Sequence, residues 1–216
     1  MPGVFLFFFK NVENVQEDSL KEGNVRNLKS IVLQPRFLQA ITAAAFAYAV
    51  MSFLMTATPL SMHVMENMSL KETGLVLQFH VVAMFLPSLI TGNLIKKYGH
   101  SAIIYGGVLF FFITVLISLF EQTYLNYMLS LIFLGLGWNF LFISGTSLVV
   151  LTYNKEEKFK VQGINDLIVF STMALASLSA GILLNSIGWK MMNIICIPFL
   201  ILIILVSFVA DKKSAS

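Results

Sequence analysis

The chain has 216 residues, of which 57% are hydrophobic and only 12% are charged, and its formal net charge is +3. Soluble domains carry about a quarter charged residues, so this composition excludes a soluble globular protein and predicts an integral membrane protein whose first partner is the lipid bilayer. Its lysines and arginines are scattered between apolar stretches and form no contiguous patch, which excludes a nucleic-acid partner.

The amino-terminal residues differ from the rest of the chain. Residues 1–9 are apolar but too short to cross a bilayer, and they lack the basic leader and cleavage site of a signal peptide. Two interpretations stay open: the stub of a missing apolar helix, and an interfacial anchor rich in Phe. Residues 10–36 are rich in acidic side chains and are expected to form a solvated cytoplasmic linker.

Six apolar stretches follow, each long enough to cross a hydrocarbon core about 30 Å thick as a helix. In lipid only a helix satisfies its backbone donors and acceptors within one segment, and no stretch alternates as a barrel strand does. We therefore expect an all-α membrane protein, with a six-transmembrane-helix bundle over 37–210 and a cytoplasmic tail at 211–216. The stretches are 37–65, 73–95, 101–120, 122–154, 161–189 and 191–210.

Basic residues gather on one side of the predicted bundle. Only Lys71 and Lys190 fall in connections on the other side. Because lysine and arginine near the ends of spans stay on the cytoplasmic face, both termini are predicted to be cytoplasmic. The residues on the basic side are Lys29, Arg36, Lys96, Lys97, Lys155, Lys158, Lys160, Lys212 and Lys213.

A polar row runs along the first stretch. Its members are three or four residues apart, so they share one face of a helix. Such a row is costly against lipid, and it predicts either one wall of a substrate path or helix packing through Ser and Thr. The proline in the row removes a backbone hydrogen bond near the outer end, where a bend would gate access. The row consists of Tyr48, Ser52, Thr56, Pro59 and His63.

The second stretch contains one candidate for proton coupling. Gln78 and His80 lie two residues apart, on different faces of a helix, so at most one of them faces a path. We favour His80, because an imidazole titrates near neutral pH. The alternative is a buried neutral histidine bonded to a backbone carbonyl.

The basic turn GNLIKKYGH separates the second stretch from the third. Gly92, Lys97 and Gly99 are spaced as in the G-x-x-x-D-(R/K)-x-G-(R/K) loop of the major facilitator superfamily, which this turn resembles. The resemblance implies a gating loop made by these residues and Lys96, between the second and third helices of a six-helix half. Lys96 replaces the family's aspartate and His100 its last basic residue, departures more usual in the carboxyl-terminal half. The positive-inside rule alone also explains such a turn.

The middle of the fourth stretch combines aromatic and polar side chains. Trp138 and Asn139 come after glycines that would let another backbone approach, and Asn139, Phe142 and Thr146 share one helix face. Amide, aromatic and hydroxyl groups together suit a partly aromatic organic substrate. An interhelical hydrogen bond from Asn139 is the alternative.

Asp166 is the only carboxylate within a span, and it needs a partner or water. It is interpreted as a coupling acid or, alternatively, as a structural ion pair with Lys160 or with the Lys96 turn. Just before it, Glu157, Lys160 and Gly163 are similar to an E-x-x-(R/K)-x-x-G element that the family carries at the foot of the fifth helix of a half.

The resemblance covers 37–210 and implies the carboxyl-terminal half of a secondary transporter, which moves a small organic solute by alternating access between two six-helix bundles. It implies a bacterial inner (plasma) membrane, and as partner a missing amino-terminal half or a second copy of the chain. A truncated or non-transporting scaffold or assembly factor is the rival interpretation. The expected path residues are Tyr48, Ser52, Thr56, His63, His80, Trp138, Asn139, Phe142 and Thr146.

Patterns for catalysis or metal binding are missing from the sequence. An intramembrane serine protease needs a histidine on a later helix, and none follows His100. H-E-x-x-H, paired carboxylates and phosphate loops do not occur, and Cys196 is the single cysteine. We therefore expect no enzymatic activity, no cofactor and no metal.

Overall fold

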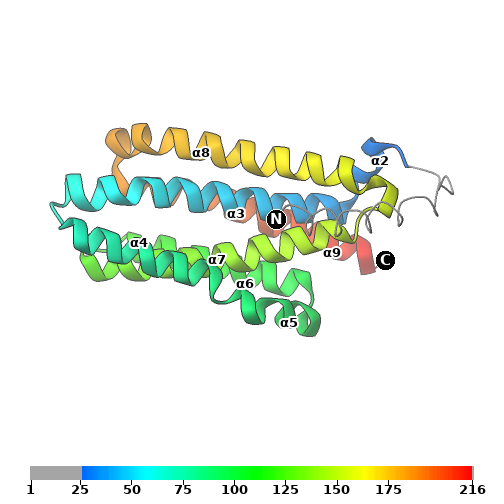
Figure 1. The fold of residues 1–216 in the computed structure, drawn as a ribbon, viewed down its shortest axis with the longest axis horizontal. Coiled ribbons are helices and arrows are strands. Elements are labelled where there is room, and N and C mark those ends of the chain that lie inside the picture. Colours follow the sequence, from blue (N-terminus) through cyan, green and yellow to red (C-terminus); the bar gives the residue numbers. More distant parts are fainter. Residues whose placement is uncertain (1–25, 216) are drawn as a thin grey trace, which may run out of the picture.

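Helices account for nearly all of the computed structural model, which describes residues 26–215 (Figure 1). The predicted stub at 1–9 and most of the predicted linker lie outside the described residues. In chain order the elements are α2 (Leu28–Val32), α3 (Pro35–Pro59), the π-helix η1 (Leu60–Met65), α4 (Leu70–Phe85), α5 (Ser88–Tyr98), α6 (His100–Ser118), α7 (Tyr124–Val150), the 3₁₀ helix η2 (Lys155–Glu157), α8 (Lys158–Ile195) and α9 (Ile197–Ala215).

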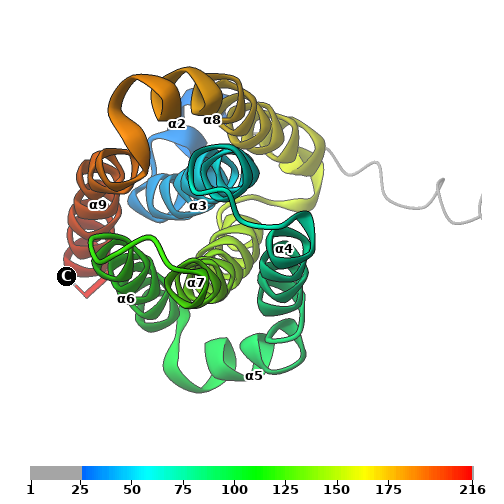
Figure 2. The ribbon, with the colours of Figure 1, turned by 90° about the vertical axis from the view of Figure 1, so that its left-hand side faces the viewer.

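Within residues 26–215, five helical stretches are apolar and long enough to cross a membrane, and the last of them, 60 residues long, contains two crossings. Within it Gly188 has φ 74° and ψ 170°, a conformation open mainly to a residue without Cβ. The chain turns back on itself at the end of α8 and returns along α9 (Figures 1 and 2). The expected all-helical bundle of six crossings is thus confirmed.

Local signals start and stop these helices where the chain reverses. Ser69 and Glu72 form a capping box at the start of α4, each side chain accepting from the other's backbone N–H. Thr123 caps α7 by accepting from the N–H of Asn126. Gly99, with φ 84°, ends α5 and lets α6 leave in a new direction. These caps fix the lengths of the hairpins between crossings.

The second and first crossings are interrupted at prolines. The stretch predicted as one helix over 73–95 is broken at Leu86 and Pro87 into α4 and α5. Pro59 ends α3, and the chain continues as the π-helix η1 instead of a further α-helical turn. Proline lacks the N–H that would bond to the preceding turn, which explains both breaks.

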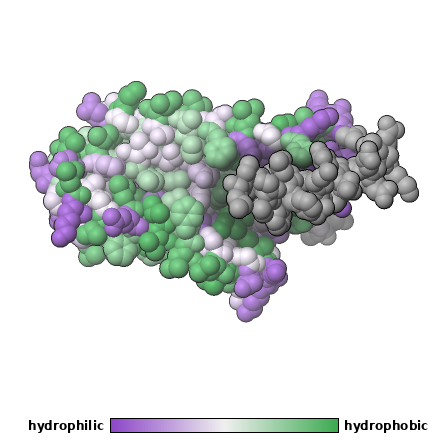
Figure 3. Space-filling view, in the orientation of Figure 1, coloured by the Kyte–Doolittle hydropathy of each residue, from purple (hydrophilic) through white to green (hydrophobic). Residues whose placement is uncertain are grey.

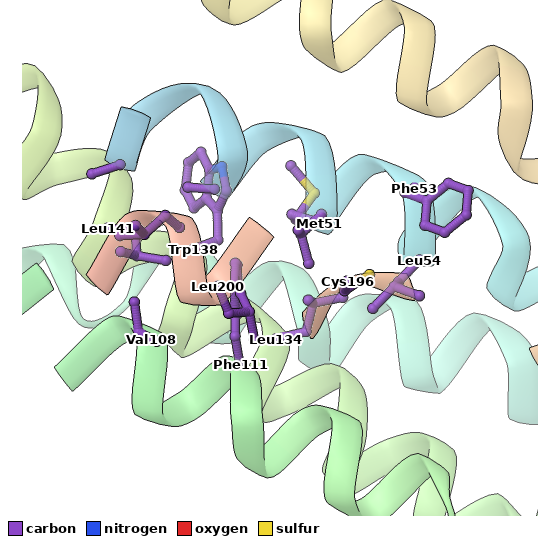
Figure 4. Packing of buried hydrophobic residues seen from close by; sticks show 14 of the residues in the cluster. Met51, Phe53, Leu54, Val108, Phe111, Leu134, Trp138, Leu141, Cys196 and Leu200 are labelled. Carbon is purple, nitrogen blue, oxygen red and sulfur yellow. The ribbon is translucent and has the colours of Figure 1, made fainter. Parts of the chain in front are cut away.

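Helices α3 and α7 lie at the centre of the bundle. Helices α8 and α9 pack against α3, and α4 and α6 pack against α7 (Figure 2). Buried side chains from α3, α6, α7 and α9 interdigitate in a continuous core, with Leu54, Phe111, Trp138 and Leu200 among them (Figure 4). Because lipid tails are as apolar as this core, close packing holds the helices together rather than exclusion of water.

Glycines on α7 allow that close packing. A Cβ added to Gly135 would lie 2.7 Å from the carbonyl oxygen of His80, and one added to Gly145 would lie 2.7 Å from that of Ala40. These distances leave no room for a side chain, so α4 and α3 approach the backbone of α7 directly. The expectation that Gly135 admits another backbone is confirmed.

The surface is largely apolar between polar ends. In Figure 3, hydrophilic side chains gather at the ends of the bundle and at the tip of α5, with hydrophobic side chains between them. On α8, Leu175, Leu178 and Ile182 are each about 70% exposed or more. A face of this kind requires lipid or another apolar protein surface against it.

Candidate functional site

Five aromatic side chains from four helices meet in one place, which we call the aromatic cluster. The rings of Trp138 and Phe142, both on α7, are stacked with centroids 5.0 Å apart. Tyr48 of α3 meets both rings edge-on, at 5.1 and 4.7 Å. Phe85, the last residue of α4, lies 5.8 Å from Trp138, and Phe170 of α8 lies 5.9 Å from Tyr48. These distances are those of favourable aromatic pairs.

The cluster is only partly covered by the rest of the described chain. Trp138 is buried, whereas Phe85 is 59% exposed and Phe170 is 49% exposed. Helix α8, which carries Phe170, packs mainly against α3, whereas α4, which carries Phe85, packs mainly against α7. The cluster therefore consists of a stacked pair of rings on α7, the ring of Tyr48, and two partly exposed rings on α4 and α8.

The polar row of α3 continues away from this cluster. Tyr48 and Ser52 are half-buried, and Thr56 and His63 are exposed. Thr56 is bonded across to α8, its hydroxyl oxygen 3.0 Å from that of Ser177. The hydroxyl groups of Tyr48, Ser52 and Thr56 therefore share one face of α3 with the ring of Tyr48, and this face meets α8 at Thr56.

The outer end of this row is held by hydrogen bonds around the π-helix. His63 lies in η1, and its Nδ1–H donates to the carbonyl of Met68 at 2.7 Å. On the buried side of the same π-helix, the hydroxyls of Ser61 and Tyr127 are 2.6 Å apart. Short π-helical turns are frequent at functional sites, and this one links the end of α3 to α7.

His80 does not join the aromatic cluster. It is fully buried between α4 and α7, and its Nδ1–H donates to the carbonyl of Leu131 at 2.7 Å. This is the geometry of the packing alternative raised for the residue. Gln78, its neighbour in the sequence, is exposed.

Asn139 is also buried, and its whole amide is engaged. Its Nδ2 donates to the carbonyl of Met84 at 2.6 Å and to the hydroxyl of Ser88 at 2.7 Å. Its Oδ1 accepts from Thr91 at 2.7 Å. Thr146 was predicted to share a helix face with Asn139. Its hydroxyl donates to the carbonyl of Phe142 in the same helix. The side chains of Asn139 and Thr146 therefore make no hydrogen bond to a side chain of the aromatic cluster.

The basic turn forms the free end of α5. Gly92, Lys96, Lys97 and Gly99 are all exposed, and the Lys97 ammonium lies 4.9 Å from the ring centre of Tyr98. The other charged candidate, Asp166, is exposed on α8, and its carboxylate accepts a hydrogen bond from Nδ2 of Asn165 at 3.0 Å. Within residues 26–215 no ion pair joins it to Lys160 or to Lys96.

Two ion pairs among residues 26–215 were not anticipated from the sequence, Arg26 with Glu157 and Arg36 with Asp211. Arg26, at the described end of the linker, forms a salt bridge of 2.7 Å with Glu157 and also donates to the carbonyl of Thr152. Its guanidinium, with help from the N–H of Asn154, lowers the pKa of Glu157 to about 2. Glu157 lies in the polar turn η2, ahead of the fifth crossing, and is 2% exposed.

Sequence reasoning also missed Phe85 and Phe170, although it found the other three members of the cluster. Both belong to stretches in which the sequence had suggested candidate residues, His80 in one and Asp166 in the other. The one available signal was that each of these helices contains aromatic residues. Which of them point inward depends on the helix face they occupy, and the sequence does not show that face because apolar residues occur on every side of α4 and α8.

Comparison with known proteins gives consistent results. The model of the Major Facilitator Superfamily matches residues 3–175 and, in a second alignment, residues 40–216. Riboflavin transporter RfnT of Brucella anthropi is 40% identical over 179 residues, which are 83% of this chain and 45% of that protein. The uncharacterized MFS-type transporter YdeG of Bacillus subtilis is 27% identical over 88% of this chain and 44% of its own. The chain spans about half the length of these relatives.

Proposed function

The chain belongs to the major facilitator superfamily, and from that membership we propose that it is one half of a secondary transporter for a planar aromatic organic solute. It is an integral membrane protein, and its transporter relatives point away from an enzyme. Movement of the solute follows from alternating access, in which two six-helix halves rock about a site near the middle of the membrane.

The observation that carries the proposal is the aromatic cluster. Trp138 and Phe142 present a stacked pair, Tyr48 meets it edge-on, and two further rings have free faces. A flat conjugated solute would insert beside the exposed rings of Phe85 and Phe170 and stack without losing hydrogen bonds. An aliphatic or highly charged solute would gain little from such a surface.

Riboflavin or a closely related flavin is the solute we propose. It combines a flat tricyclic ring with a chain of hydroxyl groups. The rings of the cluster suit the first part, and the hydroxyls of Tyr48, Ser52 and Thr56, which continue along α3, suit the second. The relative at 40% identity, named as a riboflavin transporter, supports the same choice.

We further propose the orientation and the partner. The basic residues of α5, η2 and the end of α9 lie at one end of the bundle, whereas Lys71 and Lys190 lie at the other. The positive-inside rule then supports cytoplasmic ends for the described chain, in a bacterial inner membrane. The apolar outer faces of α4 and α8 would bind a second six-helix half, supplied by a preceding segment or by a second copy of the chain.

Flavin binding to the purified chain tests the proposal. Riboflavin is titrated with the chain in lipid nanodiscs, and its own fluorescence reports stacking. We expect quenching that saturates, and about tenfold weaker binding after Tyr48→Leu or Trp138→Leu, because each removes aromatic contacts of about 1 kcal/mol or more. Uptake of riboflavin into vesicles with and without a pH gradient then tests transport and coupling.

Phe110→Leu is the matched control for these variants. Phe110 belongs to a separate aromatic group on α6 and α7, 5.3 Å from Phe140 and 5.9 Å from Phe133. Its replacement removes an aromatic ring of the same size without touching the cluster. Equal loss of binding in Phe110→Leu and Tyr48→Leu, or no binding by the native chain, would rule out the flavin site.

A further inference from the structure

The second crossing contains a break whose backbone is completed by another helix. Helix α4 ends at Phe85 and α5 begins at Ser88, with Pro87 between them. Because Pro87 has no N–H, the preceding turn cannot close in the usual way, and backbone bonding resumes with Leu89 donating to the carbonyl of Leu86. Carbonyl groups on the last turn of α4 therefore lack their usual backbone N–H partners.

One amide from α7 binds both sides of this break. Asn139 donates to the carbonyl of Met84 on α4 and to the hydroxyl of Ser88 on α5, and it accepts from Thr91 one turn further along α5. We call these four residues the hinge clasp. Asn139 is completely buried, and each bond is 2.6 or 2.7 Å long. In a dry membrane interior, such a set of bonds fixes one geometry.

Little else holds α5 in place. Thr91 is its only buried residue, and it belongs to the clasp. The helix stands away from the bundle, beneath α4 and α6 (Figures 1 and 2). The clasp is therefore the buried link between α5 and α7, beside the contacts that α5 makes with α6.

The clasp also adjoins the aromatic cluster on two of its three helices, α7 and α4. On α7, Trp138 of the cluster immediately precedes Asn139 in the sequence. On α4, Phe85 immediately follows Met84, and the rings of Phe85 and Trp138 are 5.8 Å apart. A movement of α4 against α7 that changes the spacing of these two rings would also change the separation of Asn139 from the carbonyl of Met84.

We infer that Asn139 is a positioning residue that couples occupancy of the aromatic cluster to the angle of α5. The inference rests on the proposed function for its ligand. A solute that moves Phe85 relative to Trp138 loosens or tightens the clasp, and α5 then swings with its basic turn, Lys96 and Lys97. The clasp thus links the middle of the membrane to the basic end of the bundle through one side chain.

Distances between two spin labels on the 216-residue chain in nanodiscs test the clasp. One label is placed on α5 by Lys96→Cys and the other at the end of α7 by Leu151→Cys, in a Cys196→Ser background. We expect one narrow distance in this parent. In Asn139→Leu, the fraction of molecules with that distance between the labels should fall by about tenfold, as expected for loss of several buried interhelical bonds. Ser144→Ala, on the same helix and equally buried, should leave the distance unchanged.

A second variant separates hinge control from general damage to the fold. Pro87→Ala restores the N–H and lets α4 continue into α5. Combined with Asn139→Leu, it should return a single narrow distance at a new value. Two broad distributions, or a parent distance that survives Asn139→Leu, would overturn the clasp.

Coupling to the cluster is measured with and without riboflavin. Riboflavin should shift the distance in the parent but not in Asn139→Leu, while both bind it with affinities within about threefold, since Asn139 does not face the rings. Phe85→Ala replaces the ligand as a perturbation of the cluster, and it should shift the distance only when Asn139 is present. Shifts of equal size in both backgrounds would refute the coupling. Absence of riboflavin binding would refute the proposed solute but leave the Phe85→Ala comparison decisive.

Discussion

Arg36 at the start of α3 and Asp211 near the end of α9 form an ion pair of 2.7 Å, although 175 positions separate them in the sequence. The same carboxylate accepts from Ser101 at 2.6 Å and from the hydroxyl of Tyr105 at 3.1 Å, both on α6. Three helices are thereby joined at one end of the bundle, on the side away from the aromatic cluster. A charged group therefore joins three helices at this end of the bundle.

Loss of the Asp211 carboxylate should weaken that end of the bundle. Asp211→Asn keeps the shape but removes the charge, and because both partners are about a third exposed, we expect destabilisation of about 1 kcal/mol or less. Thermal unfolding in detergent, followed by tryptophan fluorescence, measures it. The exchange of both residues, Arg36→Asp with Asp211→Arg, should recover part of the loss. A double variant less stable than the sum of the two single changes would contradict the pairing.

The Arg26 and Glu157 pair should anchor the linker to the turn before α8. In Glu157→Gln the linker loses its partner, so trypsin should cleave after Arg26 faster than in the native chain. Glu156→Gln, one residue earlier and exposed, is the matched control. Equal cleavage rates in the two variants would show that Glu157 does not hold the linker.

The same pair predicts a direction of pH dependence. The pKa of Glu157 falls from 4.5 to about 2 in the folded chain. A carboxyl group with a lowered pKa contributes stability that is complete above about 4.5 and is lost as the pH falls toward 2. The stability difference between the native chain and Glu157→Gln should therefore stay constant from pH 5 to 8 and shrink below about 4.5. A difference that changes within the neutral range would argue against the pair.

The features predicted correctly from the sequence are those that depend on composition and local chemistry. Six apolar stretches predicted six crossings, and the spacing of Gly92, Lys97 and Gly99 indicated the family that the comparisons confirm. The break at Pro87 was not predicted, because 73–95 is apolar throughout and proline inside a membrane helix is often tolerated. It depends on Asn139, which comes 52 positions later and supplies the missing bonds.

The candidate site was predicted in part for a related reason. Tyr48, Trp138 and Phe142 were found because a polar or aromatic row on a helix shows its phase. Phe85 and Phe170 are surrounded by other apolar residues, so nothing in the sequence distinguishes the face toward the cluster from the face toward lipid. Arg36 was interpreted only as a mark of topology and Asp211 only as part of the cytoplasmic tail, since only the closed bundle brings the start of α3 to the end of α9.

Labelling from the two sides of the membrane tests the orientation. Cysteines are introduced at Lys96, Lys155 and Lys71, one at a time, in a Cys196→Ser background. A membrane-impermeant maleimide applied to intact cells should label Lys71→Cys alone, and the other two should react only after the membrane is opened, because basic connections stay in the cytoplasm. Reaction of Lys96→Cys and Lys155→Cys from opposite sides would be incompatible with the bundle itself.

Close contact between α3 and α7 should make Gly145 intolerant of any side chain. A Cβ there would lie 2.7 Å from the carbonyl oxygen of Ala40 and 3.0 Å from the Cβ of Ala44. Because the first of these atoms is backbone, the helices must separate, and we expect Gly145→Ala to destabilise the chain by about 1 to 3 kcal/mol. Gly163→Ala on α8 is the matched control, since a Cβ at Gly163 meets no atom within 4 Å. There the lower entropy of the unfolded chain should make the change neutral or slightly stabilising. Thermal unfolding of both variants decides the point, and a Gly145→Ala chain as stable as Gly163→Ala would mean that the two central helices are not in direct backbone contact.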